Sequence, residues 1–121
     1  MIHEQYVSFE TAKLLKKNRF DIPLNYYYNS NGRRGYSSSY NWNETDEEYS
    51  DYSCPTQAMT MKWLREEKNI AINIWYDGEV WSSERGWIST DDGDFVLVGH
   101  YGSYEEACEE AIKYCLKNLI K

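Results

Sequence analysis

Three segments of the chain repeat hydrophobic residues at intervals of three and four positions, the period of an amphipathic helix. They span residues 8–18, 55–69 and 103–120, and Ser8 and Asn18 are expected to cap the two ends of the first helix. The last is the most regular, and it opens with Ser103 and Glu106, which match a capping box. Its apolar stripe, which we expect to face the core, consists of Tyr104, Ala107, Cys108, Ala111, Ile112, Cys115 and Leu119.

The middle helix is predicted from a weaker pattern. Pro55 suits the first position of a helix, because its missing N–H would have no partner there. Ala58, Met61 and Leu64 fall on one face with Met59 and Trp63 beside them, so we expect that side of the helix to be buried.

Alternation of apolar residues after this helix predicts β-strands. Residues 70–76 alternate, and Asp77-Gly78 is typical of a two-residue hairpin turn, which would pair Ile74 with Trp81. Residues 86–90 continue the sheet, and the unbroken apolar run at 95–100 predicts a central strand that is covered, at least in part, on both sides.

The predicted order of helix, three strands and helix indicates an α+β fold. Two helices would cover one face of a small antiparallel sheet, as in many two-layer domains. This αβββα order also occurs in double-stranded-RNA-binding domains. The glutamates at the start of the last helix, residues 103–111, would repel RNA phosphates from that end of the helix. We therefore use the similarity to predict the topology and not to predict RNA binding.

The segment before the middle helix is rich in tyrosine and lacks a clear period. Residues 24–28 follow Pro23 and favour a strand, and Asn31-Gly32 favours a turn, so an N-terminal hairpin is predicted. We treat residues 29–54 as a loose hairpin or irregular excursion from a single domain spanning residues 1–121.

Composition narrows the function classes. A chain of 121 residues with 41% hydrophobic and 17% aromatic residues can bury a core. Twenty acidic residues against 13 basic ones give a net charge of −7, which disfavours nucleic acid as a partner. The sequence has no membrane-span-length apolar run and no signal-peptide pattern, so we expect a cytoplasmic protein without a membrane partner.

Residues that could carry catalysis or bind a metal do not form a recognised pattern. The three cysteines lack a CxxC pair and are expected to be core residues. His3 and His100 lie far apart, and the acidic runs at 46–48 and 91–94 lack the spacing of a calcium loop. We therefore expect no catalytic residue, no metal and no cofactor, and a protein that is not an enzyme.

The tyrosine-rich segment is the strongest candidate for a binding surface, because tyrosine and arginine are frequent interface anchors. Its arginine pair has two interpretations: it contacts a partner, or it pairs with the local acids between residues 44 and 51. The candidate partner-binding residues are Tyr26, Tyr28, Arg33, Arg34, Tyr36, Tyr40 and Trp42.

Three blocks of the chain, in this order, resemble a family of small uncharacterised proteins from gut Bacteroidales, including Bacteroides, and their phages or prophages. The blocks are residues 7–29, 55–70 and 101–120, about half of the chain. The family has no assigned activity, so the resemblance implies a mobile-element (phage-related) origin and transfers no functional residue.

Together these observations predict a small, acidic, non-catalytic binding or regulatory protein that acts through protein–protein contacts. A sharper form is an inhibitor that presents acidic surface to a basic host factor. The alternative is a single-stranded nucleic-acid binder that uses the tyrosines and arginines of residues 26–42. The sequence predicts neither the partner's identity nor the oligomeric state.

Overall fold

The computed structural model describes residues 2–44, 50–88 and 95–120. Its internal contacts divide the chain into two compact units. The hairpin unit is Tyr6–Thr56, and the αβββα unit combines Met1–Gln5 with Gln57–Lys121. The elements in chain order are α1 (Phe9–Lys17), β1 (Leu24–Tyr28), β2 (Arg34–Tyr40), β3 (Tyr52–Ser53), α2 (Gln57–Lys68), β4 (Ile70–Tyr76), β5 (Trp81–Trp87), β6 (Val96–Tyr101) and α3 (Tyr104–Asn118).

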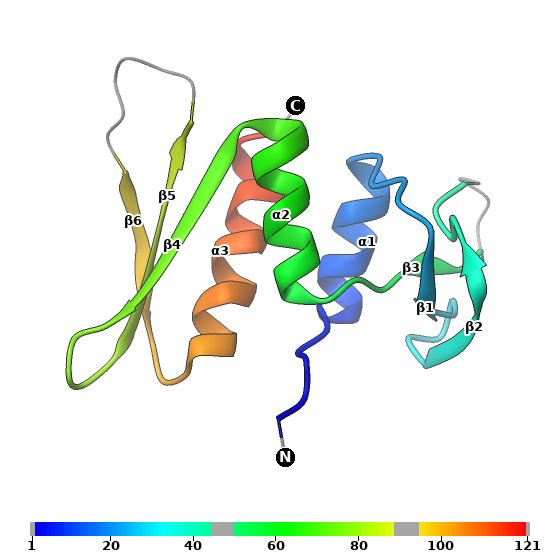
Figure 1. Ribbon diagram of the computed structural model, residues 1–121, viewed down its shortest axis with the longest axis horizontal. Helices are drawn as coiled ribbons and strands as arrows, with labels where there is room; N and C mark the ends of the chain where they lie inside the picture. Colours follow the sequence, from blue (N-terminus) through cyan, green and yellow to red (C-terminus); the bar gives the residue numbers. More distant parts are fainter. Residues whose placement is uncertain (1, 45–49, 89–94, 121) are drawn as a thin grey trace. The chain divides into compact units, whose positions relative to one another are not determined.

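The hairpin unit contains the predicted N-terminal hairpin as part of a three-stranded antiparallel sheet in the order β2-β1-β3 (Figure 1). Asn29 organises the turn, because its side-chain oxygen accepts from the backbone amides of Asn31 and Arg33. Gly32 takes a positive φ of 81°, which glycine adopts without steric cost. The third strand, β3, has two residues and was not predicted, because so short a segment carries no period.

Helix α1 supplies much of the core of the hairpin unit. Ser8 caps its first turn by accepting from the Thr11 amide at 3.2 Å, as the sequence predicted. The helix ends at Asn18, the predicted C-cap, and Arg19 follows with a φ of 64°. The fully buried hydrophobic residues around this helix are Val7, Ala12, Leu15 and Phe20.

The αβββα unit has the predicted fold, an antiparallel sheet in the order β4-β5-β6 with two helices on one side (Figure 1). Trp81 of β5 packs edge-on against Tyr104 of α3, with ring centroids 5.4 Å apart. Arg85 of β5 lies over the Tyr114 ring of the same helix. These contacts identify the face of the sheet that α3 covers.

The predicted pairing of Ile74 with Trp81 is wrong, because the two residues at the tip of the hairpin are Gly78 and Glu79 instead of Asp77 and Gly78. The Asp77 carboxylate accepts from the amides of Glu79 and Val80, and the Asp77 amide donates to the Val80 carbonyl. Tyr76 is therefore opposite Trp81, and Ile74 is opposite Ser83. A register shift of two residues keeps every side chain on its face, so the isoleucines and Trp81 still share the helix-covered face.

The prediction that residues 95–100 form a central strand is also wrong. The central strand is β5, and β6 is an edge strand on which Val96 and Leu97 are about half exposed. The sequence of β5, WSSERGW, is polar, but its small residues Ser82, Ser83 and Gly86 are buried. A Cβ on Gly86 would lie 2.6 Å from the Phe95 ring, which shows how closely that ring covers the strand.

The buried face of α2 agrees with the predicted one only in part. Leu64 and Trp63 are buried, as predicted, but Ala58 and Met59 are exposed, and the polar residues Gln57 and Thr60 are buried in their place. The side chain of Gln57 donates to the Glu105 carbonyl at 2.9 Å and to the Glu109 carboxylate at 3.0 Å. These two hydrogen bonds to α3 allow Gln57 to lie on the buried side of α2. A search for periodic apolar residues cannot predict the burial of such a polar residue.

Helix α3 confirms the predicted stripe in its central turns. Ser103 accepts from the Glu106 amide, and Ala107, Cys108, Ala111, Ile112 and Cys115 are fully buried. All three cysteines are buried thiols outside any disulfide, as predicted. None of the helices in the described part of the chain has the length and apolarity needed to cross a membrane.

Candidate binding surface on the hairpin unit

The pairing of β1 with β2 gathers four candidate residues on one side of the hairpin. Tyr26 is opposite Tyr36, and Tyr28 is opposite Arg34. Tyr6, which is held by an antiparallel bridge to Thr56, lies beside Tyr26 with ring centroids 4.7 Å apart. We call the surface formed by Tyr6, Tyr26, Arg34 and Tyr36 the arginine face.

Arg34 is held against two aromatic rings on the arginine face. Its guanidinium carbon lies 4.5 Å from the centroid of the Tyr6 ring and 5.6 Å from that of the Tyr26 ring. Tyr36 packs edge-on against Tyr26 at 5.0 Å while 68% of its surface remains exposed. Cation–π contacts of this kind contribute roughly 0.5–1 kcal/mol at an exposed site, and they restrict the arginine to a few rotamers.

The arginine pair does not neutralise local acids within the described residues. Arg33 and Arg34 are both exposed, and neither forms an ion pair with a carboxylate there. Glu44 instead accepts a short hydrogen bond from the Tyr40 hydroxyl, which raises the pKa of Tyr40. The acids at 46–48 lie outside the described residues, so that part of the expected pairing stays a prediction.

Other candidate residues serve the packing of the hairpin unit. Trp42 stacks on Tyr27 with centroids 4.3 Å apart, and its indole N–H donates to the Leu24 carbonyl at 2.8 Å. The Tyr28 hydroxyl donates to the Val7 carbonyl at 2.6 Å, and its ring packs on Phe9. These three aromatic side chains are half-buried, so their contribution to a partner surface is smaller than that of the exposed residues.

The structure thus separates the predicted set by exposure. Arg33, Arg34, Tyr36 and Tyr40 are exposed, and Tyr26 lies half-buried beneath Arg34 and Tyr36. Sequence reasoning missed Tyr6, which reaches the face through a bridge between residues 50 positions apart. No local pattern in the sequence could have indicated that bridge.

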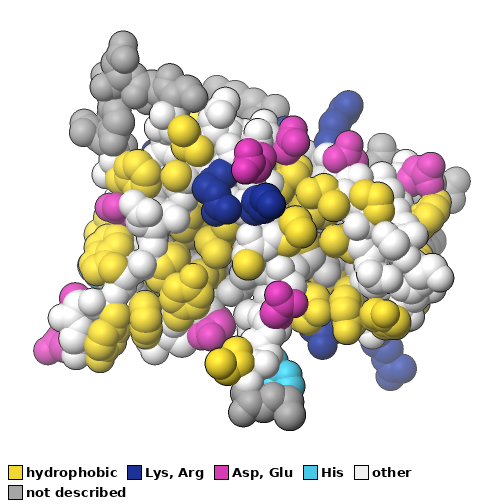
Figure 2. Space-filling model, viewed as in Figure 1, with side chains coloured by type: hydrophobic (Ala, Val, Ile, Leu, Met, Phe, Trp, Pro, Cys, Tyr) yellow, Lys and Arg dark blue, Asp and Glu magenta, His cyan; other side chains and the backbone are white. Residues whose placement is uncertain are grey.

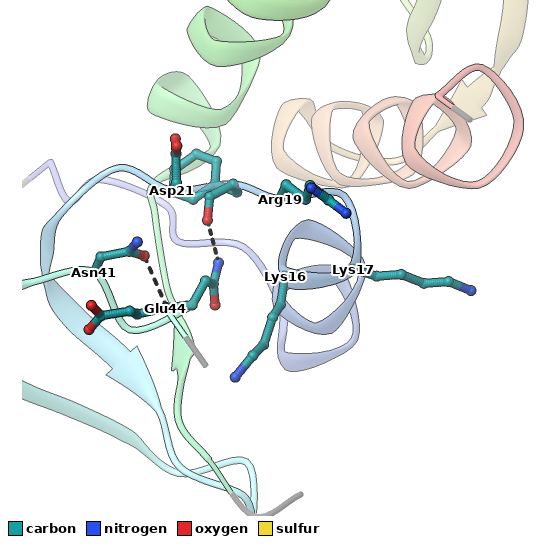
Figure 3. A pocket seen from close by; sticks show the side chains of 8 residues that line it. Lys16, Lys17, Arg19, Asp21, Asn41 and Glu44 are labelled. Carbon is teal, nitrogen blue, oxygen red and sulfur yellow. Dashed lines mark hydrogen bonds between the residues drawn. The ribbon is translucent and has the colours of Figure 1, made fainter. Parts of the chain in front are cut away.

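A polar cleft of about 460 Å³ opens elsewhere in the hairpin unit, at the end of α1 (Figure 3). Asn43 is engaged in its wall, donating to the Phe20 carbonyl at 2.8 Å and accepting from the Ser53 amide at 3.0 Å. Lys16 donates to Ser50 and to the Asp51 carbonyl, and Figure 3 shows that the cationic side chains diverge. The cleft therefore lacks a convergent set of groups that would hold a ligand. Its lining residues are Lys16, Lys17, Arg19, Phe20, Asp21, Asn41, Asn43 and Glu44.

A serine–histidine pair in the αβββα unit does not form an accessible nucleophile. The Ser82 Oγ lies 2.7 Å from the His100 Nδ1, but Ser82 is fully buried between neighbouring strands. Nearby, hydrogen bonds from the Val80 and Glu79 amides lower the pKa of Asp77, so its carboxylate is committed to the hairpin turn. The pair consequently stabilises the pairing of β5 with β6.

The described residues contain no group of three or more histidine, cysteine, aspartate or glutamate side chains that could hold a metal ion. The acidic run at 91–94, like that at 46–48, lies outside the described residues.

Comparison with protein families, with curated proteins and with solved structures finds no match for this chain. The resemblance to a Bacteroidales and phage family therefore stays a prediction.

Proposed function

We propose that this chain is a non-catalytic binding protein that acts by protein–protein contact through the arginine face. The observation that carries the proposal is the placement of Arg34 over Tyr6 and Tyr26, beside the exposed Tyr36 and without a carboxylate partner in the described residues. Arginine and tyrosine are over-represented among the residues that dominate binding energy at interfaces.

The packing of the arginine face supports this function energetically. Immobilising a flexible side chain on binding costs roughly 0.5–1.5 kcal/mol. The rings of Tyr6 and Tyr26 already restrict Arg34, so less of this cost falls on the complex. A planar guanidinium that is fixed in this way can form two parallel hydrogen bonds to one carboxylate.

The distribution of charge indicates the chemistry of the partner. The hairpin unit has six Lys and Arg residues against seven Asp and Glu, whereas the αβββα unit has seven against 13. Nearly all of the net negative charge therefore belongs to the αβββα unit. A partner at the arginine face is expected to bring carboxylates, and the basic host factor predicted from the net charge would suit the αβββα unit instead.

The test is capture of partners from a lysate of the source organism with matched baits. Arg34→Glu is expected to lose the specific partner because it reverses the charge and removes the stacked guanidinium. Arg65→Glu, the same change at an exposed position of α2, serves as the control and should retain the partner. Loss with both variants, or with neither, would contradict a specific role for the arginine face.

Single-stranded nucleic acid is the second candidate, because bases stack on aromatic rings beside arginine and the hairpin unit is close to neutral. A gel-shift with a thymidine oligonucleotide separates the two proposals. Binding that is abolished by Arg33→Glu with Arg34→Glu, and retained by Arg65→Glu, would favour nucleic acid. The absence of any shift at low salt would remove this alternative, because phosphate contacts are strongest there.

A further inference from the structure

Strand β4 is an edge strand without the usual protection against pairing. It lies at one edge of its sheet, and its seven residues pair with β5 one for one without a bulge. Its sequence, IAINIWY, contains no charged residue, proline or glycine. Soluble proteins normally protect such edges with charged residues, proline or bulges, because the unpaired N–H and C=O groups can pair with another strand.

The other edges in the described part of the chain are protected. The pairing of β2 is irregular between Leu24 and Tyr26, and β2 begins with Arg34. The pairing of β6 is irregular between Ser83 and Glu84, and β3 has only two residues. The contrast singles out β4 as the edge that is suited to accept a further strand.

The hydrogen bonds of the β4–β5 hairpin indicate which backbone groups of β4 point outward. Asp77 and Val80 form the hydrogen-bonded pair that closes the loop. Hydrogen-bonded and non-hydrogen-bonded pairs alternate along antiparallel strands, so Asn73 and Trp75 bond inward to β5. The backbone N–H and C=O groups of Ile72 and Ile74 consequently face the open edge.

We propose that β4 pairs antiparallel with β4 of a second copy of this chain, about a two-fold axis at Asn73, so that two three-stranded sheets become one of six strands. Ile72 of one copy then exchanges backbone hydrogen bonds with Ile74 of the other. Ala71 lies opposite Trp75, which sets a small side chain beside a large one.

The faces of β4 match across this axis. Ile70, Ile72, Ile74 and Tyr76 share the helix-covered face, because they are opposite Trp87, Arg85, Ser83 and Trp81. A two-fold axis perpendicular to the sheet keeps each face continuous between the copies. It also covers exposed apolar surface, since Trp75 is 38% exposed and Tyr76 is 55% exposed. Figure 2 shows hydrophobic side chains gathered over the part of the molecule that contains this sheet.

The composition of β4 permits a second copy at this edge. None of its seven residues carries a charge that would repel the second copy. The charges on either side are engaged within their own chain, since the Lys68 Nζ lies over the Trp63 ring of α2 and the Asp77 carboxylate accepts from the amides of Glu79 and Val80.

Cysteine crosslinking tests the register of the pairing directly. Opposite residues of a non-hydrogen-bonded pair have Cβ atoms about 4.5 Å apart, close enough for a disulfide after a small adjustment. The native thiols are buried, and burial raises the pKa of Cys108 to about 11 and that of Cys115 to about 12, so they are poor competitors. Asn73→Cys should form a covalent dimer under mild oxidation, and Leu97→Cys, on the exposed face of β6, should not.

Sedimentation equilibrium supplies the second measurement. The wild-type chain is expected to show a concentration-dependent dimer, and Asn73→Lys should raise its dissociation constant at least tenfold by setting two lysines at the axis. Glu84, which accepts from Asn73 at 3.1 Å, can accept from the lysine, so the single copy keeps its fold. Leu97→Lys is the matched control and should leave the constant unchanged.

Two results would overturn the proposal. One is a wild-type chain that stays monomeric at every concentration at which it is soluble. The other is a dimer in which Leu97→Cys crosslinks as readily as Asn73→Cys, because that would place the contact at another surface, such as β6.

Discussion

At the scale of single residues, the two helical alanines Ala111 and Ala58 allow a direct test of which faces are buried. Ala111 has no exposed surface on α3, whereas Ala58 is exposed on α2. Ala111→Asp buries an unpaired carboxylate and is expected to cost roughly 3 kcal/mol or more of the free energy of unfolding. Ala58→Asp should change it by less than about 0.5 kcal/mol, because the carboxylate stays in water. Urea denaturation followed by circular dichroism measures both.

The same two variants also test the buried faces predicted from periodicity against those in the structure. Periodicity assigns both alanines to buried stripes, whereas the structure buries only Ala111. A large loss of stability in Ala58→Asp would mean that the predicted face of α2 was correct and that the Gln57 side is the exposed one.

At the scale of elements, the turns of the two hairpins allow the effect of a close side-chain contact on stability to be measured. Gly32 and Gly78 both have positive φ, at 81° and 103°. A Cβ on Gly32 would lie 2.9 Å from the Phe9 ring, whereas a Cβ on Gly78 would meet nothing within 4 Å. Gly78→Ala should lower the free energy of unfolding by about 1 kcal/mol, because it adds only backbone strain. Gly32→Ala should lower it further, because the added Cβ also meets the Phe9 ring.

The measurement for the two turns is the midpoint of urea denaturation of each variant. Equal shifts would show that Phe9 moves aside at no cost. In that case the packing of α1 on the hairpin turn would be looser than its contact distances indicate.

The elements also show how far the sequence predicts the fold. The three helices, the N-terminal hairpin and the αβββα order follow from periodicity and turn residues, because these signals are local. The order of strands within a sheet is not local. β5 is central although it is polar, since its two serines are fully buried and Gly86 is covered by the Phe95 ring.

The candidate surface was predictable to a similar extent. Residue types indicated the tyrosine and arginine segment, but the two faces of the hairpin depend on register. The pairing of Tyr26 with Tyr36 places those rings beside Arg34, while Tyr27 turns to the opposite face and stacks on Trp42. The contribution of Tyr6 depends on a bridge to Thr56, which only the folded chain shows.

At the scale of the whole molecule, the unequal charge of the two units gives the two proposed interactions opposite responses to salt. Self-pairing through β4 joins two αβββα units that each carry a net charge of −6, so their repulsion opposes association. Binding of a carboxylate-bearing partner to Arg33 and Arg34 is attractive in the same conditions.

Raising the salt concentration shortens the Debye length from about 30 Å at 0.01 M to about 10 Å at 0.1 M. The dimer dissociation constant should therefore fall with added NaCl, while the dissociation constant for the partner should rise. Sedimentation equilibrium and partner titration over one NaCl series measure the two slopes, and KCl in place of NaCl controls for ion-specific effects. A dimer dissociation constant that rises with salt, or a partner dissociation constant that falls, would contradict the charge balance assigned to that interaction.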